Sequence, residues 1–504
     1  MNTRNLLEKR TYIARMGQAL SEMFSSAQYS RHKVNFHRTI RAMSLWGSYP
    51  WKSFNYQPKH VKSFEFLKLW LSLPFRTFEG IVYFAVKYLE YYPFRRFRNV
   101  DFASRKLAVF SPSLHLLEFT DRTYTGFWGE VKFLNDSVAA NTAWFLVPFK
   151  SKGISNRQTA REISRVHEET DFLLIPLAAF YSLKVMSRAI VEFVTFHRFI
   201  ARVLLVEAIG HHKNGFSWAF DAQSLGIGLS RTELNRHLIS ASLAQDNQIK
   251  NCLHLMEGQS WEIALNDVAG TSQFNCWGII HTPLRSQDSQ ILNYLLAIDK
   301  ENLAERMQGI CCPGQLTIES LNALGVSSSQ FRLIEAQRFN HYQATLNFKY
   351  SRDSRRVLYV SDANIETTEL FAELIAEKSL NDALPQVQFL WKAHPSQTHL
   401  GFTQMPRWDV SESAEFGLVI FGPETSSYLQ PEFSRSNIRT FKSNAVASNP
   451  LLGAETMIPL IETLENLEDF IENPFTLDMS DESIIAKDLN FKKWRKLIDE
   501  LLEP

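Results

Sequence analysis

The feature that most constrains the fold is the alternation of short apolar runs with amphipathic segments, in two separate series. The first series has runs at Lys106–Phe110, Ala143–Val147, Phe172–Leu177, Ile249–Met256, Cys276–Ile280 and Gln308–Cys312. The second has runs at Val357–Val360, Val387–Trp391, Leu418–Phe421 and Ile438–Phe441. Such runs predict buried strands, and strands that alternate with helices form parallel sheets through right-handed crossovers. The chain is therefore predicted to be an α/β protein with two Rossmann-like domains that face each other.

Between these runs the spacing of apolar residues predicts helices. The predicted helices span Val131–Ala139, Ser182–Ile209, Gln259–Val268, Gln290–Ala297, Thr317–Leu324 and Glu366–Ser379. Four regions follow: a helical extension at 1–100, a first domain at 101–348, a second domain at 349–475 and a closing segment at 476–504. The segment Phe491–Leu502 is amphipathic, which predicts a C-terminal helix that packs across the two domains.

Charge is distributed very unevenly along the chain. Its 504 residues carry a net charge of +1, but residues 1–100 hold 17 Lys and Arg against 5 Asp and Glu, and 21 of the 64 aromatic residues. The densest basic patch is Arg95, Arg96 and Arg98, interleaved with Phe94 and Phe97. Such a segment suits an anionic membrane surface, and it equally suits an extension that packs its rings on the main body. Nucleic acid is disfavoured as a partner because the rest of the chain is acidic.

The composition and the missing motifs narrow the function. Four cysteines, two of them adjacent and none in a CxxC pair, argue against a disulfide framework or a zinc ribbon. The start lacks the apolar run of a signal peptide, and no run reaches the ~18 apolar residues of a membrane helix. We expect a cytoplasmic protein, either free or peripheral at the inner face of the cytoplasmic membrane. Phosphate-loop, GxGxxG, HExxH and GxSxG motifs are all absent.

Polar residues follow the predicted strands of the second domain. Lys392, His394 and Pro395 follow one strand, Gly422 and Thr425–Ser427 follow the next, and Ser361 follows a third. Ligands bind beyond the carboxyl ends of strands in open α/β sheets. A cation, an imidazole and a hydroxyl-rich turn at the start of a helix would hold a phosphate without a bound metal. The sequence thus predicts an anion site in the second domain, with no cofactor and no metal.

The first domain offers an acid at a corresponding place. Glu257 follows an apolar strand and precedes Gly258, so it is expected to face the cleft between the domains. A carboxylate opposite a phosphate site can act as a general base for a hydroxyl nucleophile. Glu262, five residues later, is expected on the surface of the following helix. Glu130, in a Gly-rich turn of the same domain, is the next candidate for the base.

At these residues the chain resembles bacterial glycosyltransferases of the GT-B architecture that use CMP-activated acidic sugars, such as sialyltransferases, polysialyltransferases and capsule Kdo transferases. The matching motifs are Glu257-Gly258, Lys392-Ala393-His394-Pro395 and Ser426-Ser427, in the expected order. Two further segments, Glu257–Glu262 and Glu335–Phe339, which includes Arg338, are similar to surface carbohydrate biosynthesis proteins. The resemblance covers roughly residues 105–475.

The resemblance implies a role for each of these residues. Glu257 would be the base, and His394 would contact the phosphate and assist the departure of CMP. Ser426 and Ser427, with Lys392 nearby, would hold the phosphate or the donor's carboxylate. Apart from the resemblance, we expect Glu130, Glu262 and Arg338 to bind the acceptor or support the fold. An acid before the serine pair would bind the ribose, and Asp409, Glu412 and Glu415 all compete for that role.

The expected function is transfer of a nonulosonic acid or Kdo-like sugar from a CMP donor to a surface-glycan acceptor, such as a lipid-linked oligosaccharide. Two alternatives remain open at this point. The same fold could use a nucleoside diphosphate sugar, or the chain could be a non-catalytic scaffold in a glycan assembly complex.

Overall fold

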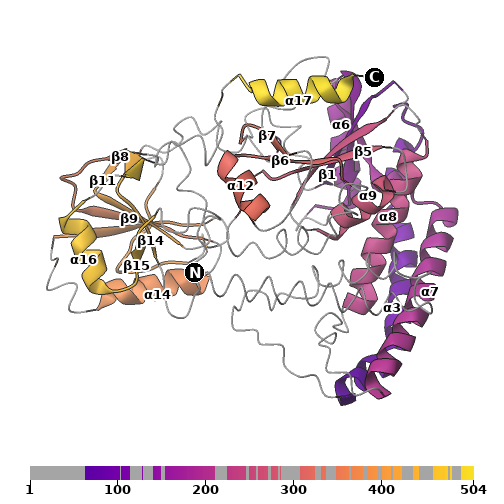
Figure 1. The fold of residues 1–504 in the computed structure, drawn as a ribbon, viewed down its shortest axis with the longest axis horizontal. Coiled ribbons are helices and arrows are strands. Elements are labelled where there is room, and N and C mark those ends of the chain that lie inside the picture. Colours follow the sequence, from indigo (N-terminus) through magenta and orange to yellow (C-terminus); the bar gives the residue numbers. More distant parts are fainter. Residues whose placement is uncertain are drawn as a thin grey trace.

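The computed structural model describes residues 63–102, 104–113, 128, 140–148, 154–209, 224–245, 249–256, 259–270, 274–281, 284, 307–323, 331–336, 348–362, 365–377, 384, 386–394, 397, 400–409, 413–422, 435–441, 458–474, 477–478, 488 and 490–503. The predicted helices at Val131–Ala139 and Gln290–Ala297 lie outside these residues. Within them, two parallel sheets form two α/β units, which confirms the predicted fold class (Figure 1).

The first unit is built on a seven-stranded parallel sheet with the strand order β3-β2-β1-β4-β5-β6-β7. Its strands are β1 (Leu107–Pro112), β2 (Thr142–Val147), β3 (Leu173–Pro176), β4 (Asn251–Leu255), β5 (Asn275–Ile279), β6 (Gly309–Cys312) and β7 (Phe331–Leu333). Residues of β1, β2, β4 and β6 are buried without exception, as expected for strands covered on both faces. All four cysteines are free, buried thiols, in β4, β5 and β6.

Helices flank this sheet. They are α3 (Ser63–Glu90), α6 (Asn156–Glu169), α7 (Leu183–Ile209), α8 (Leu229–Leu243), α9 (Ser260–Ala269) and α12 (Gln315–Ala323), with shorter turns η3 (Tyr92–Phe97), η6 (Leu177–Phe180) and η8 (Ser224–Gly228). The start of α6 is fixed by a capping box, in which Ser155 and Gln158 each accept from the other's backbone N–H.

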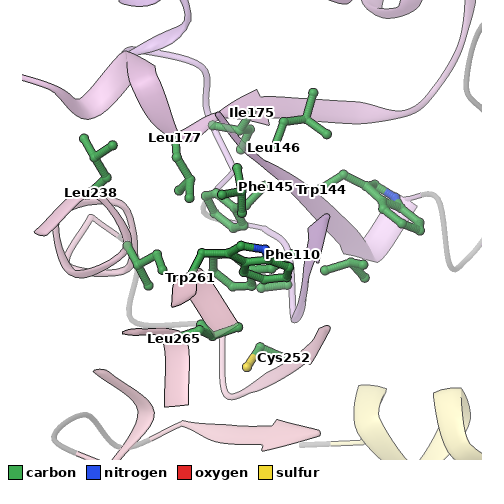
Figure 2. Packing of buried hydrophobic residues seen from close by; sticks show 14 of the residues in the cluster. Phe110, Trp144, Phe145, Leu146, Ile175, Leu177, Leu238, Cys252, Trp261 and Leu265 are labelled. Atoms are coloured by element: carbon green, nitrogen blue, oxygen red, sulfur yellow. The ribbon is translucent and has the colours of Figure 1, made fainter. Parts of the chain in front are cut away.

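Aromatic rings pack among aliphatic side chains in the core of the first unit (Figure 2). Phe110 of β1 and Phe145 of β2 stack with ring centroids 5.0 Å apart. Trp144, on the same strand as Phe145, meets Trp128 edge to face at 5.2 Å. Neighbouring parallel strands hold these rings level with one another, because Phe110 pairs with Phe145 in the β1–β2 register.

The basic extension contributes helix α3 to this core. Along one face of α3, Phe84 packs its ring edge-on against Phe193 of α7 at 5.6 Å, and Tyr181 donates to the Phe84 carbonyl oxygen at 2.9 Å. At Gly80 a Cβ atom would collide with the Phe193 ring, so the absence of a side chain allows α3 and α7 to pack closely. Helix α3 of the extension therefore packs aromatic rings on the main body, which is one of the two roles expected from the sequence.

The second unit holds a five-stranded parallel sheet with the order β10-β9-β12-β14-β15. The strands are β9 (Arg356–Val360), β10 (Gln388–Lys392), β12 (Leu418–Phe421), β14 (Ile438–Phe441) and β15 (Leu460–Ile461), with helices α14 (Ile365–Ala376) and α16 (Leu464–Glu472). Short pairs β8 (Phe348–Tyr350) with β11 (Ala414–Phe416), and β13 (Arg435–Ser436) with β16 (Leu477–Asp478), stand beside it. Alternate residues of β9 enter separate apolar clusters on the two faces.

The chain then returns to the first unit through α17 (Lys492–Leu502). Trp494, Leu497, Ile498 and Leu501 of this helix are buried in the core of the first unit. The helix lies over that unit in Figure 1. Two parallel α/β units with a C-terminal helix returning to the first is the GT-B type of arrangement; contact of α17 with the second unit stays a prediction. Among the described helices, none is long and apolar enough to cross a membrane.

Candidate functional site

The carboxyl edge of the five-stranded sheet brings together several predicted site residues. Strand β9 lies between β10 and β12, and Val360 is level with Lys392 on one side and with Phe421 on the other. The residues that follow, Ser361 and Gly422, therefore emerge beside His394. These segments are more than 60 residues apart at their extremes in the sequence, yet they end at one edge because the strands are parallel.

Ser361 ties two of these strand ends together. The backbone N–H of His394 donates to Ser361 Oγ at 2.7 Å, and the backbone N–H of Ser361 donates to the Lys392 carbonyl oxygen at 3.1 Å. Ser361 is buried, whereas the side chains of Lys392 and His394 are half-buried. The buried serine thus fixes the backbone from which a cation and an imidazole project at the edge of the sheet.

Sequence reasoning missed a polar network directly beneath this edge. Asp362 is buried, and its carbonyl oxygen accepts from Gln397 Nε2 at 3.0 Å, while Thr368 Oγ1 of α14 donates to Gln397 Oε1 at 3.0 Å. Gly422 closes over Asp362, because a Cβ atom there would lie 2.7 Å from Asp362 Oδ2. The position of Asp362 directly after Ser361 was the available signal for its part in the site.

The other predicted residues of this site are Pro395, Thr425, Ser426, Ser427 and Glu412, which lie outside the described residues. The backbone N–H of Gly422 donates to the Val360 carbonyl oxygen at 2.9 Å, so the chain enters this segment from the same edge. A role for the Thr425–Ser427 turn in binding an anion stays a prediction.

Two of the three candidate ribose-binding acids can be placed. Glu415 lies on β11, three residues before β12 begins, so it is at the amino end of that strand, away from the candidate site. It is exposed and paired with Lys349 at 2.8 Å. Asp409 lies differently: Arg407 forms a parallel bridge with Trp391 of β10, so the chain runs from there toward the carboxyl edge. The geometry favours Asp409 over Glu415.

The first unit contains a cavity of about 390 Å³ along the carboxyl edge of its sheet. Ser113, Pro148 and Pro176 line it from the ends of β1, β2 and β3, and Gln259 and Trp261 line it from the segment after β4. Helices α3, α6 and α8 complete its wall. Because the strands involved are neighbours in the order β3-β2-β1-β4, the cavity follows half of the sheet edge.

The wall of this cavity combines aromatic rings with charged and amide side chains. Arg231 and Asn235 come from α8, and Tyr83, Lys87 and Glu90 come from α3. Lys87 and Glu90 pair with each other at 2.5 Å. Burial raises the pKa of Tyr83, although the charge of Arg231 opposes the shift, so the phenol stays neutral. Arg231 lies beside the Tyr83 phenol, and this combination of aromatic rings and polar side chains suits a ring-shaped polar ligand.

Glu257, the predicted base, lies outside the described residues, but its neighbours do not. Met256 ends the buried strand segment and donates its backbone N–H to Ile279 at 2.8 Å, and Gln259 lines the cavity. Glu257 and Gly258 are the two residues between these positions in the sequence. The direction of Glu257 stays a prediction, as do the roles of Glu130 and Arg338, which are also outside the described residues.

The expectation for Glu262 was wrong. It was placed on the surface of its helix, but in the first turn of α9 it is fully buried. Helical periodicity alone places Glu262 on the exposed side of α9. In the structure α9 packs against α8 as well as against the sheet, so more than one face of α9 is covered. An acid in the first turn of a helix is favoured by the helix dipole. The structure favours a supporting role for Glu262.

Among the described residues, one acid and histidine cluster has the spacing of a metal site. Glu192 of α7 with Glu233 and His237 of α8 places its ligand atoms within 4.8 Å of one another. Arg236, however, forms ion pairs with both carboxylates. The cluster is therefore better described as an ion-pair network that joins α7 to α8.

This network predicts an acid-sensitive contribution to stability. Burial, together with the charges of Arg236 and Arg188, lowers the pKa of His237 to about 3. Since the unfolded pKa is about 6.5, the contribution is complete above pH ~6.5 and is lost as the pH falls toward 3. The wild-type protein should lose free energy of unfolding between pH 7 and pH 4. We expect the His237→Gln variant to lose up to about 3 kcal/mol less over the same interval, measured by urea unfolding. Equal pH slopes for both proteins would contradict this assignment.

The sequence and the structure were compared with known proteins. No family model and no curated protein matches the sequence. Among solved structures, the chain is similar to the UDP-GlcNAc 2-epimerase from Neisseria meningitidis bound to UDP-GlcNAc, with 10% identity and a TM-score of 0.40, over 79% of this chain and 99% of that one. The fold described above rests on the chain's own strand order.

Proposed function

We propose that this protein is a glycosyltransferase that moves a nonulosonic acid or Kdo-like sugar from a CMP donor to a surface-glycan acceptor. The observation that carries the proposal is the meeting of Ser361, Lys392, His394 and Gly422 at one sheet edge. The choice of CMP among nucleotides is supported by the Lys-x-His-Pro, Glu-Gly and Ser-Ser motifs of the sequence.

The second unit would hold the donor. Lys392 supplies a positive charge and His394 an N–H donor for the phosphate whose bond to the sugar breaks. As the anomeric carbon–oxygen bond lengthens, negative charge accumulates on the departing CMP, and donors already fixed in position stabilise that charge. Ser361 serves as a positioning residue, because it holds the backbone of His394. Asp409 is the proposed contact to the ribose.

The first unit would hold the acceptor. Its cavity has the aromatic and polar wall that suits a saccharide, and Arg231 suits one that carries an acidic group. The acceptor hydroxyl oxygen attacks the anomeric carbon, Glu257 takes the hydroxyl proton, and the bond to CMP breaks. Atoms and charge balance without a redox partner, so the residues of the chain suffice for this direct displacement.

Nucleotide binding tests the proposal first. In a thermal-shift panel of CMP, CDP, UDP and GDP, we expect CMP to give the largest stabilisation, since a ligand at 100 times its Kd stabilises by ~2.7 kcal/mol. Stronger stabilisation by UDP or GDP would indicate that the donor is a nucleoside diphosphate sugar and not a CMP-sugar. Stabilisation by none of the four would favour a non-catalytic scaffold.

His394→Ala is expected to lower donor turnover by ~10²–10³, the usual cost of removing one fixed donor to a developing charge. His394→Gln keeps an N–H donor and should recover part of the rate. CMP release from a CMP-sugar, measured in excess EDTA, is the readout, with the unfolding midpoint as a control for folding. Unchanged turnover in the alanine variant would remove His394 from the site, and complete loss of wild-type activity in EDTA would contradict the metal-independent mechanism.

A further inference from the structure

We infer that the outer face of α3 docks on an anionic lipid surface, with its apolar side chains inserted at the interface. The relevant side chains form what we call the apolar stripe: Leu67, Leu71, Phe75, Phe78, Val82, Val86 and Leu89. Each of them is between 41% and 75% exposed, which is unusual for large apolar residues that recur along one helix. This inference does not depend on the proposed function.

The stripe is continuous and faces away from the core. Its members are spaced by three or four residues, which at 100° per residue places them within an arc of about 100°. Leu73 and Phe84, on the opposite side of α3, are buried against the body of the protein. At 1.5 Å per residue the stripe is about 33 Å long. Tyr92, in η3 just beyond the end of α3, is 66% exposed and has a ring suited to the membrane interface.

Charges around the stripe select an anionic partner. Exposed cations stand at both ends, Lys68 near its start and Arg96 and Arg98 beyond its end. On the described side chains of α3, the acids Glu79 and Glu90 are each neutralised by an ion pair, with Arg76 at 2.8 Å and Lys87 at 2.5 Å. Residues 1–62, which precede the helix, add eleven Lys and Arg against two Asp and Glu. Each basic residue near an anionic bilayer adds attraction to lipid phosphates.

The same charges argue against a second copy of the chain as the occupant. Pairing two stripes would bring two sets of exposed cations together, and like charges repel. An anionic bilayer can satisfy both the apolar side chains and the cations, because its acyl region buries the former and its phosphates attract the latter. An in-plane helix that packs Leu73 and Phe84 against the protein and turns the apolar stripe to lipid is therefore the arrangement the observations favour.

Vesicle flotation with the full chain tests the inference. We expect binding to phosphatidylglycerol-containing vesicles and much weaker binding to pure phosphatidylcholine. The double variant Phe75→Ser/Phe78→Ser should weaken binding ~10-fold or more, because both rings lose their burial in lipid. Ile365→Ser, which removes a partly exposed apolar side chain on α14 of the second unit, is the matched control and should bind as wild type. Salt should weaken binding without abolishing it, since only the charge term is screened.

Three outcomes would overturn the inference. They are no binding to anionic vesicles, equal binding by the double variant, and a wild-type oligomer that dissociates in the double variant without any lipid. The last result, read from the mass in sedimentation, would assign the stripe to self-association. A second double variant, Leu71→Ser/Leu89→Ser, keeps the test valid if the first one fails to fold as judged by circular dichroism.

Discussion

Replacing Glu335 with Ala is expected to lower the free energy of unfolding by about 3 kcal/mol or more. Glu335 is fully buried, and its carboxylate accepts from the backbone N–H groups of Lys493 at 2.8 Å and Trp494 at 3.0 Å. Helix α17 has no capping side chain of its own, so this distant carboxylate caps its first turn. Loss of the carboxylate would leave two backbone donors without their partner, and each hydrogen bond to a charged group contributes ~1.5–3 kcal/mol.

Chemical denaturation of the purified variants measures this effect. Glu335→Gln keeps one acceptor oxygen and should lose less stability than Glu335→Ala. Glu500→Ala is the matched control, because Glu500 lies on the exposed side of the same helix, 3.7 Å from Arg332, and exposed ion pairs contribute ~0–1 kcal/mol. Release of α17 should also make the C-terminal segment of Glu335→Ala more sensitive to protease. Equal stabilities for the Glu335 and Glu500 variants would show that the cap is not needed.

Glu335 stands in the chain between the cores of the two units. Ile334 belongs to the core of the first unit, whereas Ala336 belongs to a cluster of the second unit that includes Leu358 and Val360. Three consecutive residues thus join the first core, the C-terminal helix and the second core. The segment Glu335–Phe339 is one of those that resemble surface carbohydrate biosynthesis proteins. In the structure its first residue, Glu335, holds the start of α17 through two hydrogen bonds.

The sequence was most informative where strands are buried on both faces. Every residue of β1, β2 and β4 is buried, and each predicted strand overlaps the observed one within a few residues. The short strands β7 and β8 were missed because their residues are only partly buried and alternate with exposed ones. Glu262 shows the opposite error, since helical periodicity identifies an apolar face and says nothing of a polar side chain covered by a second helix.

The two halves of the candidate site differ in how far sequence could reach. The residues at the edge of the five-stranded sheet could be predicted from the sequence. Parallel strands all end at one side of a sheet, so the residues that follow each strand are expected to lie together. The cavity of the first unit could not be predicted from the sequence, because its wall combines Lys87 from α3 with Arg231 from α8. These residues meet only through helix packing across more than 140 positions, and no local pattern marks such a contact.

Glu257→Gln is expected to lower sugar transfer by ~10²–10⁴ while donor binding is retained, and it separates a base from a binding residue. The amide keeps the shape and hydrogen-bonding capacity of the side chain but cannot accept the acceptor's proton. Single-turnover transfer from a CMP-sugar and CMP binding by calorimetry give the two quantities. Glu169→Gln, at the exposed end of α6 in the same unit, is the charge-matched control and should transfer at the wild-type rate.

The pH profile distinguishes a lost base from lost positioning. A general base gives wild-type transfer a rise with pH through the pKa of its carboxyl, and Glu257→Gln should lack that rise, whereas a misplaced acceptor would lower the rate equally at every pH. The buried Glu262 provides the contrast, because Glu262→Gln should reduce stability and keep the wild-type pH profile. If Glu257→Gln transfers sugar at the normal rate, Glu257 is not the base, and Glu130 becomes the residue to replace next.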